Sequence, residues 1–296
     1  MRYPNRMRGR TEIRVSRYEA QVGGWPVRYE AAGEGEPVVL VHGLSGSTRW
    51  WSRNISEIAE QYQVYLVDLP GFGTMRRLRR RFILAESADW LSEWMDAAGL
   101  ERAHLVGHSM GGYICLHLAA SRPEAVRRLV LVAPAGVPTG RSMAGYLGPL
   151  FGAALYARPS FLPVLARDAL RTGPATLWRA ARDLLAEDLR EDLRRVATPT
   201  LLVWGERDTL VPPAVGNLMR EEIPGSRLLV LARAAHVPMF DRPKEFNAAL
   251  LSFLAAEPDF TAGIMVSASH NPVCCTLVIP NRLASASAAS SSSRTW

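Results

Sequence analysis

The feature that most constrains this chain is the pentapeptide Gly107-His108-Ser109-Met110-Gly111. It follows an apolar run that begins at Ala103, and it precedes apolar residues at helical spacing that continue until Pro123. A Gly-x-Ser-x-Gly pattern in this context is typical of a turn so sharp that the serine has a strained backbone and only glycine fits two positions away. The pattern predicts a strand, a turn and a helix that expose the hydroxyl of Ser109. An ordinary glycine-rich turn is the alternative.

A serine hydroxyl is a weak nucleophile at neutral pH, so it needs a base and an acid that orients the base. The chain has six histidines. His236 lies in a loop directly after the apolar run 228–231, whereas the others fall beside the serine, in a strand or helix, in another loop or in the tail. We expect His108 to point away from Ser109. His236 is therefore the predicted base, and a solvated loop histidine is the alternative.

Asp208 is the predicted acid. It lies in a turn after a second apolar run, which begins at Thr200. The carboxyl ends of neighbouring parallel strands lie along one edge of a sheet, so Ser109, Asp208 and His236 should meet although they are far apart in sequence. A turn or helix cap is the alternative role for Asp208, and Glu206 in the same turn is a competing acid.

A glycine-rich loop follows the apolar run 38–41. Acyl transfer needs N–H groups aimed at the carbonyl oxygen as it gains negative charge. The backbone N–H groups of Leu44, in this loop, and Met110, after the serine, are the predicted pair. The expected substrate-pocket residues are His42, Gly43, Trp50 and Val237. For Trp50, a place in the hydrophobic core is the alternative.

In the order nucleophile, acid and histidine, these residues resemble the α/β-hydrolase family over roughly residues 14–256. The resemblance implies an α/β fold with a mostly parallel, eight-stranded sheet and helices on both faces, and hydrolysis through an acyl-enzyme on Ser109 without a cofactor or metal. A carboxylic ester is the favoured substrate, while amides, lactones and carbon–carbon bonds stay open. The matching motifs are His42-Gly43, Asp68 to Gly73, Gly107 to Gly111, Gly205 to Asp208, and His236 to Pro238.

The chain divides by pattern into four segments. Residues 1–135 and 199–257 are expected to form the two parts of the hydrolase core. The helical pattern of residues 136–198 lies where the family inserts a cap, and its apolar residues favour a small hydrophobic substrate. Residues 258–296 are rich in Ser and Ala and are expected to be a disordered tail, native or the product of a fusion or frame shift.

Composition narrows the partners. The net charge is +7, and the densest basic run, Arg76 to Arg81, is either a solvated loop or a surface for an anionic partner. No nucleic-acid motif accompanies it, so a nucleic-acid partner is not expected. Three cysteines, no apolar leader and no bilayer-length apolar run favour a cytoplasmic protein without an integral membrane segment. The oligomeric state is not predicted.

Two other functions stay open. A non-catalytic receptor for a small molecule can use the same fold, because fold does not determine function. The tail segment 263–272 is similar to the phosphoserine loop of phosphohexomutases, with Ser269 at the phosphorylated position. A mutase fragment is therefore the remote alternative, although the chain lacks room for that family's other domains.

Overall fold

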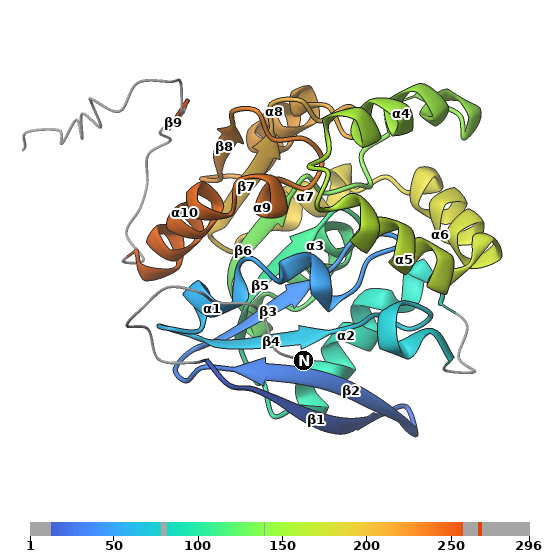
Figure 1. Ribbon diagram of the computed structural model, residues 1–296. Coiled ribbons are helices and arrows are strands. Elements are labelled where there is room, and N and C mark those ends of the chain that lie inside the picture. The colour runs from blue at the N-terminus through green and yellow to red at the C-terminus, as the bar shows by residue number, and fades with distance from the viewer. Residues whose placement is uncertain (1–12, 78–81, 139, 257–265, 268–296) are drawn as a thin grey trace, which may run out of the picture.

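A twisted sheet lies at the centre of the computed structural model, which describes residues 13–77, 82–138, 140–256 and 266–267 (Figure 1). In the described residues the strand order is β1-β2-β4-β3-β5-β6-β7-β8-β9. The strands are β1 (Val15–Val22), β2 (Trp25–Ala32), β3 (Pro37–Val41), β4 (Gln63–Val67), β5 (Ala103–His108), β6 (Val126–Val132), β7 (Thr200–Gly205), β8 (Arg227–Leu231) and β9 (Val266–Ser267).

Most neighbouring strands are parallel. The pairs β1–β2 and β2–β4 are antiparallel, and every other neighbouring pair in the described sheet is parallel. The predicted α/β fold with a mostly parallel sheet of eight strands is confirmed by β1 to β8. The two-residue strand β9 lies within 258–296; the rest of that segment, including Ser269, falls outside the described residues, as do residues 78–81 of the arginine run.

Helices cover both faces of this sheet, because its central strands are apolar on both sides. Along β3, Val39 and Val41 pack into one hydrophobic core, while Val38 and Leu40 pack into the other. The first core also holds residues of α2 (Ser87–Ala97), α3 (Met110–Ser121) and α8 (Pro213–Glu222). The second holds residues of α1 (Ile55–Ile58), α9 (Pro238–Asp241) and α10 (Pro243–Ala255).

The chain between β6 and β7 is helical. It contains the 3-10 helix η5 (Ala144–Tyr146) and the helices α4 (Leu147–Tyr156), α5 (Leu162–Thr172), α6 (Pro174–Ala186) and α7 (Arg190–Arg195). Proline suits the first position of α6, because it lacks a backbone N–H and an N–H at that position would have no acceptor within the helix. These helices fall inside the segment 136–198, for which a helical cap is expected; a role as cap stays a prediction.

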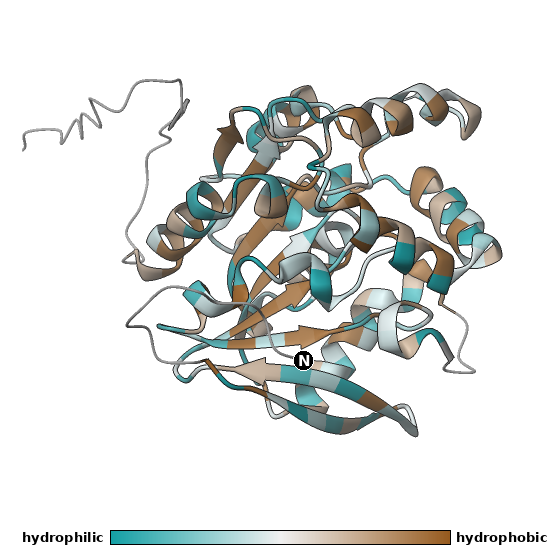
Figure 2. Ribbon diagram, in the orientation of Figure 1, coloured by the Kyte–Doolittle hydropathy of each residue, from teal (hydrophilic) through white to brown (hydrophobic). Residues whose placement is uncertain are grey.

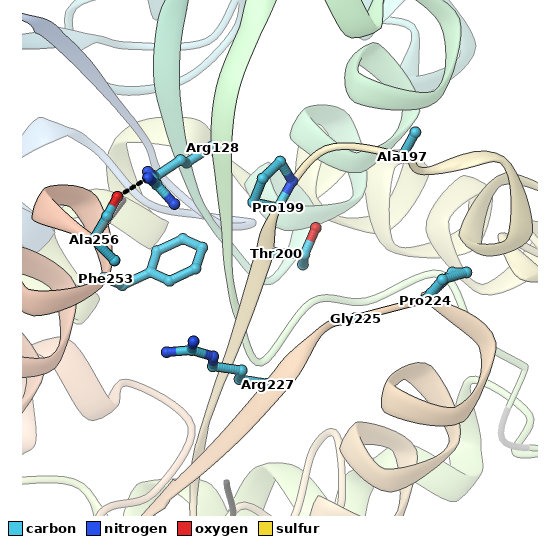
Figure 3. Close-up of a pocket in the computed structure, with 9 residues that line it drawn as sticks. All are labelled: Arg128, Ala197, Pro199, Thr200, Pro224, Gly225, Arg227, Phe253 and Ala256. Atoms are coloured by element: carbon cyan, nitrogen blue, oxygen red, sulfur yellow. Dashed lines mark hydrogen bonds between the residues drawn. The ribbon is translucent and has the colours of Figure 1, made fainter. Parts of the chain in front are cut away.

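Two further features of the fold are the character of its helices and the position of a cavity. Within the described ranges, no helix is both long and apolar enough to cross a membrane. Figure 3 shows a cavity near Arg128, Thr200 and Arg227, which lie at the starts of β6, β7 and β8. Ser109 follows the end of β5, so this cavity lies at the opposite edge of the sheet from the predicted site.

Candidate active site

Ser109 occupies the turn between β5 and α3, as the pentapeptide predicts. Its backbone has φ 51° and ψ −114°, a conformation that costs a residue with a side chain roughly 1–3 kcal/mol. A Cβ on Gly107 would lie 2.3 Å from the backbone oxygen of Gly111, so only glycine permits strand and helix to approach this closely. The turn therefore holds the serine side chain at the carboxyl edge of the sheet, where Ser109 is 8 % exposed and so more buried than the pattern predicts.

Ser109, His236 and Asp208 form one hydrogen-bonded chain. His236 Nε2 lies 3.1 Å from Ser109 Oγ, and His236 Nδ1 lies 2.8 Å from Asp208 Oδ2. Because a carboxylate only accepts, Nδ1 carries the proton and Nε2 is left to accept from the serine hydroxyl. The imidazole is 11 % exposed and the carboxylate is 0 % exposed, so this arrangement is largely shielded from water. The structure thus brings the three predicted residues together.

The carboxylate of Asp208 has a defined orientation. Its Oδ1 accepts hydrogen bonds from the backbone N–H groups of Leu210 at 2.9 Å and Val211 at 3.0 Å. The competing acid, Glu206, instead accepts from the backbone N–H of Arg233 at 2.9 Å through Oε2, and its side chain is exposed. The geometry therefore assigns the contact with the imidazole to Asp208.

His108 supports the loop that carries His236. Its Nε2–H donates to the main-chain oxygen of His236 at 2.8 Å, and the two rings are 4.9 Å apart. Burial, aided by the nearby imidazole of His236, holds the pKa of His108 well below its ordinary value, so the ring is neutral. On the other side, Asp241 Oδ2 accepts from the backbone N–H of Ala235 at 2.8 Å. These contacts hold the backbone on which the imidazole is mounted.

The loop after β3 lies directly against the serine turn. A Cβ on Gly43 would lie 2.7 Å from His108 Nδ1 and 3.1 Å from Ser109 Cβ. Leu44 follows this glycine, and Met110 is the first residue of α3. The two expected N–H donors therefore come from segments in contact with the serine.

His42 is held by the backbone on both sides. Its Nδ1–H donates to the oxygen of Gly43 at 2.9 Å, and its Nε2 accepts from the N–H of Leu69 at 3.0 Å. The ring is fully buried, and burial lowers its pKa. Its place in a substrate pocket stays a prediction, but both nitrogens already stabilise the loop.

A buried carboxylate joins this loop to the helical segment. Asp168 of α5 is 2 % exposed. Its Oδ2 accepts from Ser47 Oγ at 2.6 Å and from Trp50 Nε1 at 3.2 Å. Ser47 precedes the 3-10 helix η1 (Thr48–Trp51), and the Trp50 ring packs 5.5 Å from that of His108. Trp50 is thus buried beside the site, as is Val237, which is 8 % exposed.

Sequence patterns indicated neither Asp168 nor the contact of His108. An aspartate in an amphipathic helix is ordinarily solvated, and the distance in sequence from Asp168 to Ser47 gives no periodic signal. The expectation that His108 points away from Ser109 excluded it as the base but missed its bond to the main chain of His236. The described part of the chain contains no cluster of three or more His, Cys, Asp or Glu side chains arranged to hold a metal ion.

Known proteins similar to this chain indicate one family. The model of a family described as alpha/beta hydrolase matches residues 38–249. A pimeloyl-[acyl-carrier protein] methyl ester esterase of Aeromonas hydrophila is 34 % identical over 248 residues, which cover 74 % of this chain and 96 % of that protein. A 2-hydroxy-6-oxo-6-phenylhexa-2,4-dienoate hydrolase of Comamonas testosteroni is 30 % identical, covering 80 % and 93 %.

A solved structure shows the same architecture. The chain described as Est816, an N-acyl homoserine lactone degrading enzyme, superposes with a TM-score of 0.72 at 26 % identity. The match covers 80 % of this chain and all of that one.

Proposed function

This chain belongs to the alpha/beta hydrolase family, and on that premise we propose that it is a serine hydrolase acting on the carboxylic ester of a small hydrophobic molecule through an acyl-enzyme on Ser109. The observation that supports this function best is the hydrogen-bonded chain from Ser109 Oγ through His236 to Asp208. It has the order and the donor directions that nucleophilic catalysis by serine needs.

In the first step, His236 Nε2 takes the proton of Ser109 Oγ as the oxygen attacks the ester carbonyl carbon. The imidazolium that forms is stabilised by Asp208, whose Oδ2 accepts the Nδ1–H. His236 then gives its proton to the alcohol that leaves, and an acyl-serine remains. In the second step, water loses a proton to His236 and attacks the acyl carbon. His236 then returns the proton to Ser109 Oγ as the acid leaves, which regenerates free Ser109.

The negative charge on the carbonyl oxygen needs N–H donors that are already in place. We assign this role to the N–H groups of Leu44 and Met110. The support for it is the close contact of Gly43 with Ser109, together with the position of Met110 at the start of α3, where the N–H has no acceptor within the helix.

The helices between β6 and β7 supply the roof of the site in this proposal. The hydrogen bonds from Ser47 and Trp50 to Asp168 place α5 against the loop that carries Leu44, one of the two predicted oxyanion donors. A site between such a roof and the sheet edge is shielded from water and suits an apolar acyl or alcohol group. The similar proteins are named for an ester, a dienoate and a lactone. Among these acyl substrates, we propose the ester.

A fluorophosphonate probe tests the nucleophile. We expect it to label the wild-type protein and the variant Ser121→Ala, which loses an exposed hydroxyl at the end of α3, but not Ser109→Ala. Turnover of short p-nitrophenyl esters should fall on the order of a millionfold in Ser109→Ala. Labelling that persists in Ser109→Ala would overturn the proposal, and a burst without turnover in the wild type would favour a receptor.

A further inference from the structure

The helix α4 carries an unusual concentration of exposed apolar side chains. Leu147, Leu150, Phe151 and Leu155 are 70 %, 53 %, 73 % and 67 % exposed. Their spacing of three and four residues places them on one stripe of the helix, which we name the α4 face. No residue of α4 is buried, and Figure 2 colours much of this helix as hydrophobic. Single exposed apolar residues are ordinary, but a continuous stripe of them marks a docking surface.

The stretch of sequence that contains α4 carries charges of one sign. Residues 125–167 contain neither Asp nor Glu, and Arg141 and Arg158 lie on either side of α4 in the sequence. Both side chains are exposed. A third exposed arginine, Arg207, comes from the turn after β7 and lies close to the C-terminal end of α4.

Each end of α4 also pairs a tyrosine with a guanidinium group. The guanidinium of Arg141 lies 5.8 Å from the ring centre of Tyr146, just before the helix. That of Arg207 lies 5.8 Å from the ring centre of Tyr156, the last residue of the helix. An apolar stripe flanked by tyrosine and arginine is the composition of helices that lie in the interface between lipid headgroups and acyl chains.

We propose that the α4 face docks on an anionic phospholipid bilayer. The arginines complement the negative headgroups, while the leucines and Phe151 enter the boundary of the acyl chains. A second copy of this chain fits less well, because a symmetric contact through the same face would bring Arg141 and Arg207 of one copy towards those of the other.

Docking would place lipid beside the site. Thr209 Oγ1 donates to the main-chain oxygen of Pro149 in α4 at 2.7 Å, and the main-chain oxygen of Thr209 accepts from Arg141 Nη1 at 3.2 Å. Thr209 directly follows Asp208, so α4 is attached to the turn that holds the acid. Membrane binding itself does not depend on the hydrolase function.

The test is co-sedimentation of the full chain with vesicles, in the Ser109→Ala background so that no lipid is cleaved. The vesicles contain phosphatidylglycerol and phosphatidylcholine in equal parts, or phosphatidylcholine alone. We expect the triple variant Leu150→Ser, Phe151→Ser, Leu155→Ser to bind the anionic vesicles at least about tenfold more weakly. The double variant Arg141→Gln, Arg207→Gln should lose roughly fivefold per arginine and become less sensitive to salt.

The control is a double variant on the β1–β2 hairpin, Trp25→Ser with Arg28→Gln, which removes an exposed aromatic and an exposed charge far from α4 (Figure 1). It should bind as the parent does. Circular dichroism shows whether each variant is folded, and the arginine variant tests the idea separately if the triple variant unfolds. Failure of the parent to bind anionic vesicles, or equal binding by the α4 variants, would overturn the proposal. So would a dimer that the triple variant abolishes while vesicle binding is unchanged.

Discussion

Replacement of Asp208 by asparagine should leave the fold intact and abolish the proposed function of His236 as a base. The amide has two orientations in this site. With its oxygen towards the N–H groups of Leu210 and Val211, it keeps both hydrogen bonds that Oδ1 now accepts. The reverse orientation leaves the part-buried N–H of Leu210 and the buried N–H of Val211 without an acceptor, at about 1–3 kcal/mol each. The first orientation should therefore predominate by at least roughly thirtyfold.

In that orientation the amide NH₂ faces His236 Nδ1, which must then accept a hydrogen bond. The imidazole proton moves to Nε2, and the ring can no longer take a proton from Ser109. We expect kcat for a short p-nitrophenyl ester to fall between roughly thirtyfold and ten thousandfold, or by about 2–5 kcal/mol in the activation free energy, according to how far the first orientation predominates. The free energy of unfolding in urea should change by less than about 1 kcal/mol, because every hydrogen bond of the carboxylate has a replacement.

The matched control is Glu206→Gln, an identical chemical change two residues away on a side chain that contacts Arg233 rather than the imidazole. It should keep kcat within about threefold of the wild type. Steady-state kinetics of both variants, with fluorophosphonate labelling of Ser109, decides the matter. Activity within tenfold of wild type in Asp208→Asn, or an equal loss in Glu206→Gln, would refute the assignment of the acid.

Three further predictions concern stability. Asp168→Ala removes the acceptor of two buried donors, one of them Ser47 Oγ, and should lower the free energy of unfolding in urea by about 2–5 kcal/mol, with a smaller loss in Asp168→Asn. Gly107→Ala should cost about 3 kcal/mol or more because its Cβ meets main chain at 2.3 Å, whereas Gly148→Ala, with nothing within 4 Å, should be neutral or stabilising; a similar effect of both in thermal unfolding would refute the packing argument. The pKa of His108 is lowered in the folded chain, so below about pH 6.5 the unfolded chain takes up a proton that the folded chain does not. The free energy of unfolding should therefore decrease as the pH decreases below about 6.5. His108→Gln should reduce that slope by up to about 1.4 kcal/mol per pH unit in urea titrations.

The sequence predicts the positions of Ser109, Asp208 and His236 better than it predicts the contacts that hold them in place. Ser109, Asp208 and His236 could be placed together because each follows a buried strand, and the carboxyl ends of parallel strands share one edge. The sequence favoured Asp208 but left Glu206 as a competitor, because both lie in the same turn and only the direction of each side chain separates them. The bond from His108 to His236 depends on a rotamer that no pattern specifies.

The contacts of the helical segment were the least predictable. Its apolar spacing indicates helices, but spacing alone does not say which residues of a helix become buried. Asp168 is buried because a segment distant in sequence, around Ser47 and Trp50, packs against α5. Both of these side chains donate hydrogen bonds to its carboxylate. Leu147 and Phe151 show the converse, because a pattern typical of core residues lies on the outside of the fold.

The left-handed backbone of Ser109 also limits what substitution can reach at this position. A side chain branched at Cβ is strongly disfavoured at such dihedral angles, so threonine fits poorly although it offers the same hydroxyl. A variant that exchanges the proposed nucleophile is best tolerated when the new side chain is unbranched at Cβ, such as a thiol or a carboxylate. Main-chain geometry at residue 109 therefore limits which nucleophilic side chains the turn can carry, whatever their reactivity.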